Sequence, residues 1–229
     1  MSPFAFAAAV SLLLLSGCAA VPAPTAPGPA APAAAAGDIV QAGTPGLRTR
    51  AAEVPRERIA TPEFQALFAR MIDTMRRAPG VGLAGPQIGV PWRVIVLEDR
   101  AELMARATPE EVAERGRVAF GPRVFVNPVL RLVGEERASF FEGCLSVRGY
   151  VGVVARHLEV EVSGLDEHGV EQVWRVRGWP ARILQHEVDH LDGTLYVDRM
   201  LTRSFANADL ARALYGGKPA AEILRLLGP

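Results

Sequence analysis

The sequence has few cysteines, few histidines and no excess of charge of either sign. Its 229 residues include two cysteines and four histidines, and 25 Lys and Arg residues balance 25 Asp and Glu residues. Evenly mixed charge argues against a nucleic-acid-binding or polybasic membrane-binding surface, so we expect no nucleic acid among the partners. With 49% hydrophobic residues the chain can bury one good core. A small molecule or a peptide fits this composition better as a substrate than a nucleic acid or a membrane surface does.

The chain also lacks a long hydrophobic run. The apolar stretch 2–15 is shorter than the ~20 residues that a membrane-spanning helix needs, and it is typical of the apolar part of a secretory signal. Residues 15–18 read Leu-Ser-Gly-Cys, the box at which bacterial lipoprotein signals are cut and lipidated, and an Ala/Pro-rich tether follows. We therefore divide the chain into a lipoprotein-like signal (1–18), a tether (19–37) and a folded domain (38–229).

Basic residues are missing from the first part of the chain, where Arg48 is the first Lys or Arg. This argues against an Arg-rich organellar transit peptide. It also departs from a secretory signal, which carries a basic start, so the alternative is a cytoplasmic protein whose translation start is placed too far upstream. Because the box and the tether occur in the right order, we prefer an exported protein anchored to the membrane through Cys18.

Apolar spacing predicts an α+β domain with small mixed or antiparallel sheets around a central helix. Helices are predicted behind the Thr61-Pro62-Glu63 cap, as one or two surface helices within 98–116, from Pro180 towards Gly193, and at 221–227. Strands are predicted at 92–97, 123–133 with a break at Asn127-Pro128, 137–141, 158–164 and 170–176. We expect His157 and His168 to be exposed and without function.

The stretch 80–89 is rich in glycine, which permits close approach of the backbone or positive φ. It follows a helix and precedes a strand, so it is not a dinucleotide-binding fingerprint, and it lacks the Lys and Ser/Thr of a phosphate-binding loop. A tight packing turn is the plain structural interpretation.

Residues 185–193 read Gln-His-Glu-Val-Asp-His-Leu-Asp-Gly. In a helix His186 and His190 lie on one face, spaced to bind a single ion. Glu187 lies about 100° around the helix from His186, where it can act on water without being a ligand. This H-E-x-x-H pattern is typical of hydrolytic metal sites, although two histidines four residues apart on a solvated helix are the alternative.

A catalytic metal needs a third protein ligand. Some zinc proteases take it six residues after the second histidine, where this chain has Tyr196, and others take a Glu from a downstream helix. No Glu occurs between Glu187 and Glu222, so the ligand must come from upstream. Cys144, the only cysteine of the predicted folded domain, is the leading candidate, because its thiolate completes a Cys-His-His set with an open fourth position. A small buried apolar residue is its alternative role.

Three motifs together resemble the signatures of peptide deformylases, in the order and spacing of that family. They are Gly-Val-Gly-Leu-Ala-Gly-Pro-Gln at 80–87, Glu-Gly-Cys-Leu-Ser at 142–146, and the stretch 185–193. The similarity runs from about Ile39 to Phe205, and 178–182 and 198–200 most resemble the branch that includes organellar deformylases. Gly85 stands where that family usually has Ala, and Arg148 stands where it commonly has Pro.

The resemblance implies a metal-dependent hydrolase that removes the formyl group from N-terminal formylmethionine of peptides or nascent proteins. Cys144, His186 and His190 would hold one divalent ion, with Glu187 as general base. The family implies Fe²⁺, with Ni²⁺ or Zn²⁺ as substitutes. Ligand softness alone favours Zn²⁺, as would export from the cell, because export exposes Fe²⁺ to oxidation.

The resemblance also implies how the substrate is held. The Gln87 side chain and the Leu145 backbone N–H would stabilise the oxyanion, and Val81 and Gly82 would pair with the peptide backbone as with an added strand. Two further side chains are candidates to line an apolar pocket for methionine: Trp179 and Ile183.

Two other functions are consistent with parts of the sequence. A zinc endopeptidase could be built on H-E-x-x-H, but the missing downstream ligand disfavours it. An exported, non-catalytic protein could bind formylated peptides or metal, but this chain retains every catalytic residue type. We expect the protein to be a monomer whose partners are N-formylmethionyl peptides.

Overall fold

The structure of the protein, a computed structural model, describes residues 39–228 together with Met1. The predicted signal, the tether and Cys18 lie outside the described residues. Among the helices that are described, none is both long and apolar enough to cross a membrane.

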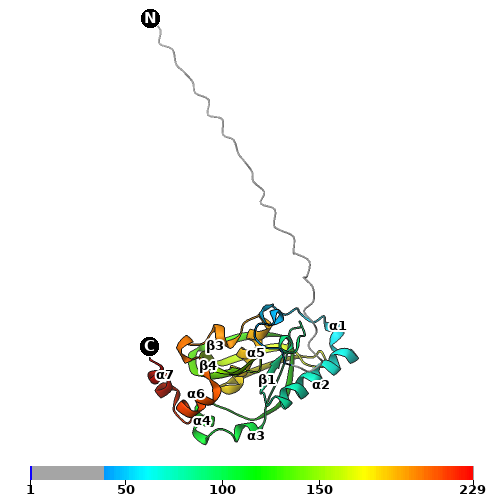
Figure 1. The fold of residues 1–229 in the computed structure, drawn as a ribbon. Helices are drawn as coiled ribbons and strands as arrows, with labels where there is room; N and C mark the ends of the chain where they lie inside the picture. Colours follow the sequence, from blue (N-terminus) through cyan, green and yellow to red (C-terminus); the bar gives the residue numbers. More distant parts are fainter. Residues whose placement is uncertain (2–38, 229) are drawn as a thin grey trace. The chain divides into compact units, whose positions relative to one another are not determined.

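Six strands of the described chain form one antiparallel sheet (Figure 1). The strands are β1 (Gly82–Ala84), β2 (Val94–Asp99), β3 (Phe120–Cys144), β4 (Val147–Leu165), β5 (Glu171–Arg177) and β6 (Ala206–Asn207). Their hydrogen-bonded order is β1-β2-β3-β4-β5, with β6 beside β4. The expectation of several small sheets is corrected to one continuous sheet, because β3 and β4 span 25 and 19 residues.

The break predicted at Asn127-Pro128 is a bulge within β3. The pairing with β4 shifts register between Val126 and Val129, and Asn127 adopts a positive φ of 52°. The Asn127 side chain accepts from the Val54 backbone N–H and donates to the Val54 carbonyl oxygen, both at 2.9 Å. The strand therefore continues beyond the bulge, and the bulge fastens the N-terminal segment.

Helices lie before, between and after the strands (Figure 1). They are α1 (Arg56–Ile59), α2 (Pro62–Arg77), α3 (Ala101–Met104), α4 (Pro109–Glu114), α5 (Trp179–Leu191), α6 (Ala208–Tyr215) and α7 (Ala220–Leu227), with 3₁₀ turns η1 (Pro45–Arg48), η2 (Gly85–Ile88), η3 (Tyr196–Asp198) and η4 (Thr202–Ser204). The helices predicted after Thr61 and at 221–227 and the two short helices between strands are confirmed. Helix α6 was not predicted.

Strand β2 separates two packed helices. Its side chains alternate between the faces of the sheet, so that Val94 and Val96 pack in one buried cluster with α2, and Ile95 and Leu97 pack in the other with α5. All six residues of β2 are buried: the first four are apolar and pack in these two clusters, and the last two are carboxylates that pair with arginines. Helix α5 is thereby held on a rigid layer next to β1.

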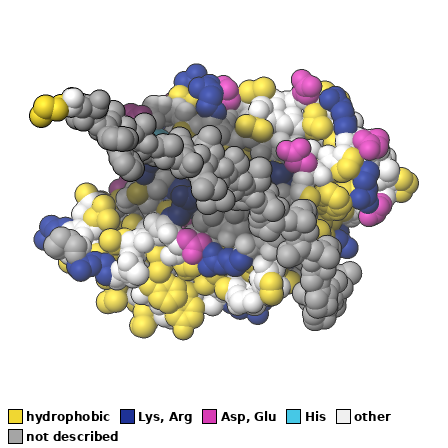
Figure 2. Space-filling model, turned by 90° about the horizontal axis from the view of Figure 1, so that it is seen from above, with side chains coloured by type: hydrophobic (Ala, Val, Ile, Leu, Met, Phe, Trp, Pro, Cys, Tyr) yellow, Lys and Arg dark blue, Asp and Glu magenta, His cyan; other side chains and the backbone are white. Residues whose placement is uncertain are grey.

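The charged side chains are intermixed on the surface. On the face seen in Figure 2, Lys and Arg side chains lie beside Asp and Glu side chains, with hydrophobic side chains between them. His168, in the β4–β5 turn, is exposed as expected.

The expectation for His157 is wrong, because its residue is 9% exposed. His157 lies within β4, where its Nδ1 is 3.1 Å from the Gly134 carbonyl oxygen and its Nε2 is 2.9 Å from Arg137 Nη2. Both partners of the His157 side chain belong to the paired strand β3. The sequence around His157 gives no sign of this pairing, so the burial of the side chain was not predicted.

Candidate active site and metal centre

Helix α5 presents His186 and His190 next to each other, with ring centroids 5.0 Å apart. Gly178 precedes the helix with a φ of 77°, and Pro180 occupies its first turn. Gly193, with a φ of 75°, turns the chain away after the last turn. The remaining positions are largely buried against the sheet, so both rings face the protein interior.

The β3–β4 hairpin brings Cys144 to this helix. Strand β3 ends at Cys144, and its Sγ lies 3.3 Å from Nε2 of His190. One candidate ligand atom from each of Cys144, His186 and His190 lies within 4.8 Å of the others. One thiolate and two imidazoles in such a group have the donor chemistry of a divalent transition-metal site.

Glu142 orients His186. Its Oε2 lies 3.0 Å from Nδ1 of His186, which leaves Nε2 of that ring for the cluster. Glu142 also accepts two hydrogen bonds from Arg156 at 2.9 Å and one from Arg182 at 2.6 Å. Burial opposes ionisation of Glu142, but the hydrogen bonds from His186 and Arg156 hold its pKa well below the usual range.

The ion pairs around Glu142 extend along α5 to Asp189. Arg156 also donates to Asp189, which accepts two hydrogen bonds from Arg199 at 2.7 and 2.8 Å. Sequence reasoning assigned no role to these residues or to Glu142. The only local signal was the position of Glu142 inside the Glu-Gly-Cys-Leu-Ser motif.

Glu187 packs against the backbone of β1. A Cβ added at Gly82 would lie 2.3 Å from Glu187 Oε1, so only glycine leaves room for this carboxylate. Glu187 is 4% exposed, and its Oε2 has no hydrogen-bond partner among the described atoms. Burial raises the pKa of Glu187 to about 7, although the charge of His186 opposes this.

Gln87 is fixed with its donor end towards the cluster. Its Oε1 accepts from the Ala84 backbone N–H at 2.8 Å, and Nε2 lies 3.5 Å from Cys144 Sγ and 3.4 Å from Ser146 Oγ. The Ser146 backbone N–H also points to Cys144 Sγ, at 3.4 Å. The amide is therefore both buried and oriented.

The turn that carries Cys144 is held by Gln41, which sequence reasoning missed. Gln41 Nε2 donates to the Leu145 carbonyl oxygen at 3.0 Å. Its Oε1 accepts from the Arg148 backbone N–H at 3.4 Å, a contact that a proline at that position could not make. This contact gives a structural reason for a residue other than proline at position 148.

Gly85 is explained by a second close approach of the backbone. A Cβ at this position would lie 2.7 Å from the Trp92 carbonyl oxygen and 3.0 Å from that of Val90. An alanine would require the segment that leads into β2 to move.

Tyr196 is packed beside the cluster. Its ring centroid lies 6.3 Å from that of His186, and its hydroxyl has no hydrogen-bond partner among the described atoms. Burial raises the pKa of the Tyr196 phenol well above its usual value, so this group stays protonated.

A pocket of about 360 Å³ opens beside the cluster. Of the candidate residues in the described domain, His190 alone does not line it. Those that do are Val81, Gly82, Gln87, Cys144, Leu145, Trp179, Ile183, His186 and Glu187. The structure thus brings together residues from β1, η2, the β3–β4 turn and α5 around one cavity.

The sequence matches the family model described as polypeptide deformylase over residues 36–205. Peptide deformylase 1A, chloroplastic, of Solanum lycopersicum is 51% identical over 172 residues, which are 75% of this chain and 62% of that protein. Peptide deformylase 1 of Streptomyces coelicolor is 53% identical over 177 residues, 76% of this chain and 78% of that one.

Solved structures give the same result. The Met-Ala-Ser-bound class I type b peptide deformylase from Acinetobacter baumannii aligns with a TM-score of 0.63 at 33% identity, covering 71% of this chain and 96% of that chain. This chain spans less than two thirds of the length of the Solanum lycopersicum relative, 62% of it. From the family match and these relatives, the chain belongs to the polypeptide deformylase family.

Proposed function

We propose that this protein removes the formyl group from the N-terminal formylmethionine of peptides or nascent proteins by metal-dependent hydrolysis. The observation that carries the proposal is the cluster of Cys144, His186 and His190 next to a pocket that Glu187 and Gln87 line. Membership of the deformylase family supports the same reaction.

Cys144, His186 and His190 would hold one divalent ion. Their donor atoms are grouped, and His186 is already oriented by Glu142. A bound ion polarises a carbonyl group and lowers the pKa of water towards ~7. The thiolate of Cys144 lowers the net charge of the site to about plus one, and its softness favours Zn²⁺, whereas the resemblance favours Fe²⁺ with Ni²⁺ as a further substitute.

Glu187 would act as the general base. Its carboxylate takes a proton from the attacking water and passes that proton to the nitrogen of the leaving amine. The unpartnered Oε2 is available for this transfer.

Gln87 and the Leu145 backbone N–H would bind the oxyanion that forms when water attacks the formyl carbon. The Ala84 contact holds the Gln87 carbonyl group away from the site, so that its NH₂ group stays available. One such donor is typically worth ~3 kcal/mol of activation barrier.

The peptide would bind along β1. This strand is at one end of the hydrogen-bonded order, so that a substrate backbone can pair with its outer edge at Val81 and Gly82. Trp179 and Ile183 line the same pocket and would contact the methionine side chain. The A. baumannii relative was solved with the peptide Met-Ala-Ser, which suggests formyl-Met-Ala-Ser as a substrate for assay.

The proposal is tested by incubating metal-loaded protein with formyl-Met-Ala-Ser and identifying the products by mass spectrometry. We expect formate and intact Met-Ala-Ser. Cleavage of internal peptide bonds would indicate an endopeptidase instead, and binding without any product would indicate a non-catalytic peptide-binding protein.

We further propose that the protein is a monomer attached to the exported side of the membrane through Cys18. The Leu-Ser-Gly-Cys box and the Ala/Pro-rich tether support this location. Nascent formylated chains are made in the cytoplasm, so an exported enzyme would act on formyl peptides released from the cell.

A further inference from the structure

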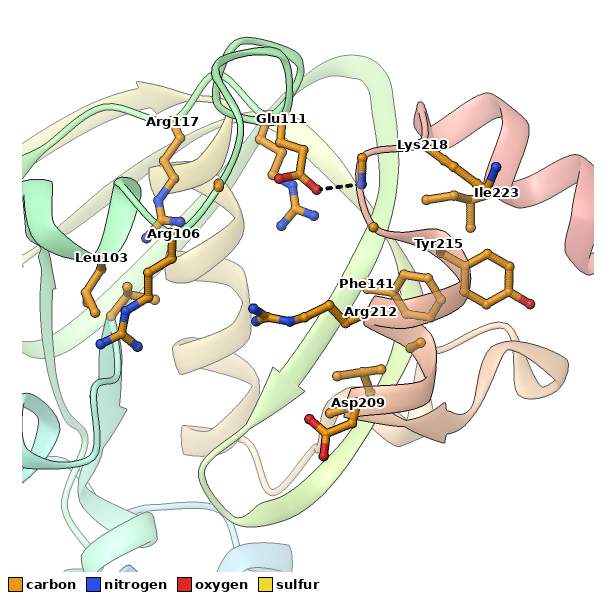
Figure 3. A pocket seen from close by; sticks show the side chains of 18 of the residues that line it. Leu103, Arg106, Glu111, Arg117, Phe141, Asp209, Arg212, Tyr215, Lys218 and Ile223 are labelled. Atoms are coloured by element: carbon orange, nitrogen blue, oxygen red, sulfur yellow. Dashed lines mark hydrogen bonds between the residues drawn. The ribbon is translucent and has the colours of Figure 1, made fainter.

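A second pocket, of about 530 Å³ (Figure 3), adjoins the candidate active site. Its walls come from the α3–α4 segment and from helices α6 and α7. Five residues line both this pocket and the active-site pocket: Pro79, Val81, Phe141, Val151 and Ala208. Because Val81 is the proposed start of backbone pairing with the peptide, the two cavities are contiguous at the point where the substrate would lie.

Basic side chains predominate in this second pocket. Five basic residues line it: Arg106, Arg115, Arg117, Arg212 and Lys218. Two of them already have partners, because Arg117 binds the fully buried Asp99 at 2.6 Å and Lys218 binds Glu222 at 2.9 Å.

The other three guanidinium groups make no direct ion pair, although the Glu111 carboxylate attracts those of Arg115 and Arg212. No carboxylate of the described residues lies within the 4.0 Å ion-pair distance of Arg106, Arg115 or Arg212. Arg106 and Arg212 come from opposite walls of the pocket (Figure 3). Arg115 lies over the Trp179 ring, with its guanidinium carbon 5.1 Å from the ring centroid. Because Arg115 lines the second pocket and Trp179 lines the active-site pocket, this contact connects the two.

The two acidic residues of the lining offset this charge only in part. The Glu111 carboxylate accepts from the Thr108 backbone N–H at 2.9 Å and from the Gly217 backbone N–H at 3.2 Å, the latter drawn in Figure 3. Asp209 makes no ion pair with any residue in the described part of the chain. The lining therefore carries five positive and two negative side chains.

We propose that this basic pocket binds a carboxylate of the substrate peptide, within the first few residues after formylmethionine, and that the protein prefers acidic formyl peptides. The inference rests on the proposed function, because it places the peptide along Val81. A carboxylate can accept charge-assisted hydrogen bonds from guanidinium groups of both walls. It can be supplied by an Asp or Glu side chain or by the C-terminus of a short peptide.

The first experiment compares matched peptides on metal-loaded, full-length protein at low salt. Formyl-Met-Ala-Glu-amide is compared with formyl-Met-Ala-Gln-amide, a second pair carries Glu or Gln one residue later, and formyl-Met-Ala-Gln with a free carboxylate tests the C-terminus. We expect at least one carboxylate peptide to exceed its neutral partner about 10-fold in kcat/KM, through KM. This preference should shrink as salt is added.

Variants assign the preference to the pocket. In the Arg106→Gln/Arg212→Gln double variant the ratio should fall to within about 2-fold, while turnover of the neutral peptides is kept. Arg225→Gln, an exposed arginine of α7 outside the lining, is the matched control and should keep the ratio. Ratios near one for every pair in the unaltered protein, or an unchanged ratio in the double variant, would overturn the inference.

A binding measurement separates this inference from the proposed function. Calorimetry with the product peptides Met-Ala-Glu-amide and Met-Ala-Gln-amide, and their counterparts with the later Glu or Gln, needs no turnover. An approximately 10-fold difference in Kd that disappears in the double variant supports the carboxylate pocket even if no formate is released. The carboxylate pocket is contradicted, even if deformylation occurs, when two results are found together. The affinities are equal within every Glu/Gln pair, and Met-Ala-Gln with a free C-terminal carboxylate binds no more tightly than Met-Ala-Gln-amide.

Discussion

The carboxylate of Glu187 rests against the Cα of Gly82, in a space that a methyl group would fill: a Cβ there would lie 2.3 Å from Oε1. The proposed base is therefore positioned by a residue 105 places earlier in the chain. Because Gly82 also belongs to the strand proposed to bind the peptide, one position controls both the base and the substrate backbone.

Gly82→Ala should displace Glu187 and lower kcat by about 100-fold or more, the usual contribution of a positioned general base. The ion should stay bound, since Cys144 and both histidines are unchanged. Steady-state kinetics with metal analysis checks this. Gly121→Ala, whose Cβ would meet nothing within 4 Å, is the control. Full activity of Gly82→Ala would mean that Glu187 does not need this position.

Gln87→Leu should reduce kcat by about two to three orders of magnitude, because an oxyanion donor is lost. It should also cost some stability, since the Ala84 N–H loses its acceptor. Gln65→Leu removes an amide that bridges the Ile59 and Glu167 carbonyl oxygens far from the site, and it serves as the control. If both variants lose activity equally, the effect is one of folding rather than catalysis.

Glu142→Gln should weaken metal binding about 10- to 100-fold, the usual effect of removing the group that orients a histidine ligand. Competition with a chelator measures this affinity. Glu98→Gln breaks a different carboxylate–arginine pair, that of Glu98 with Arg76, and should leave metal affinity unchanged. An unaltered affinity in Glu142→Gln would show that His186 needs no support.

Glu98 should stabilise the fold in a pH-dependent way. Its hydrogen bond from Arg76 lowers the pKa of Glu98, against the opposing effect of burial. Because the folded pKa lies below the unfolded value of 4.5, the stabilisation is complete well above pH 4.5 and is lost as pH falls through the folded pKa. Glu98→Gln should thus cost about 1 kcal/mol at neutral pH and progressively less below pH ~4.5. Denaturant titrations of both proteins at pH 7 and pH 3 measure this. A constant difference would exclude the ion pair as its cause.

The mature N-terminus tests the proposed location. Mass spectrometry of protein purified from its native cells should find a diacylglyceryl-modified Cys18 at the start of the chain. A chain that begins near Asp38 would instead indicate a cytoplasmic protein.

Elements with local signals could be predicted from the sequence. Helix α2 shows its core-facing stripe from Phe64 to Met75, and the hairpin of β4 and β5 is marked by its turn. Helix α6 was missed although it has a local signal, an Asn207 cap followed by apolar residues at helical spacing; it is short, and its Leu210 and Leu214 are each 61% exposed. The unbroken length of β3 was missed since the turn-like Asn127 is accommodated as a bulge.

The candidate site divides in the same way. The two histidines and Glu187 lie within one helical turn, so spacing alone places them together, and Cys144 followed by elimination. The support of His186 by Glu142, 44 residues away, and of Glu142 by Arg156 and Arg182 depends on strand register that no local pattern encodes. The fit of Gly82 to Glu187 likewise requires the packing of α5 on β1.

The most direct test of the account is formate release from formyl-Met-Ala-Ser by the metal-loaded protein and by its Glu187→Gln variant, with bound metal quantified in both. We predict that both bind one ion per chain and that only the unaltered protein releases formate at a significant rate. Equal formate release by Glu187→Gln, or none by the fully loaded unaltered protein, would contradict it.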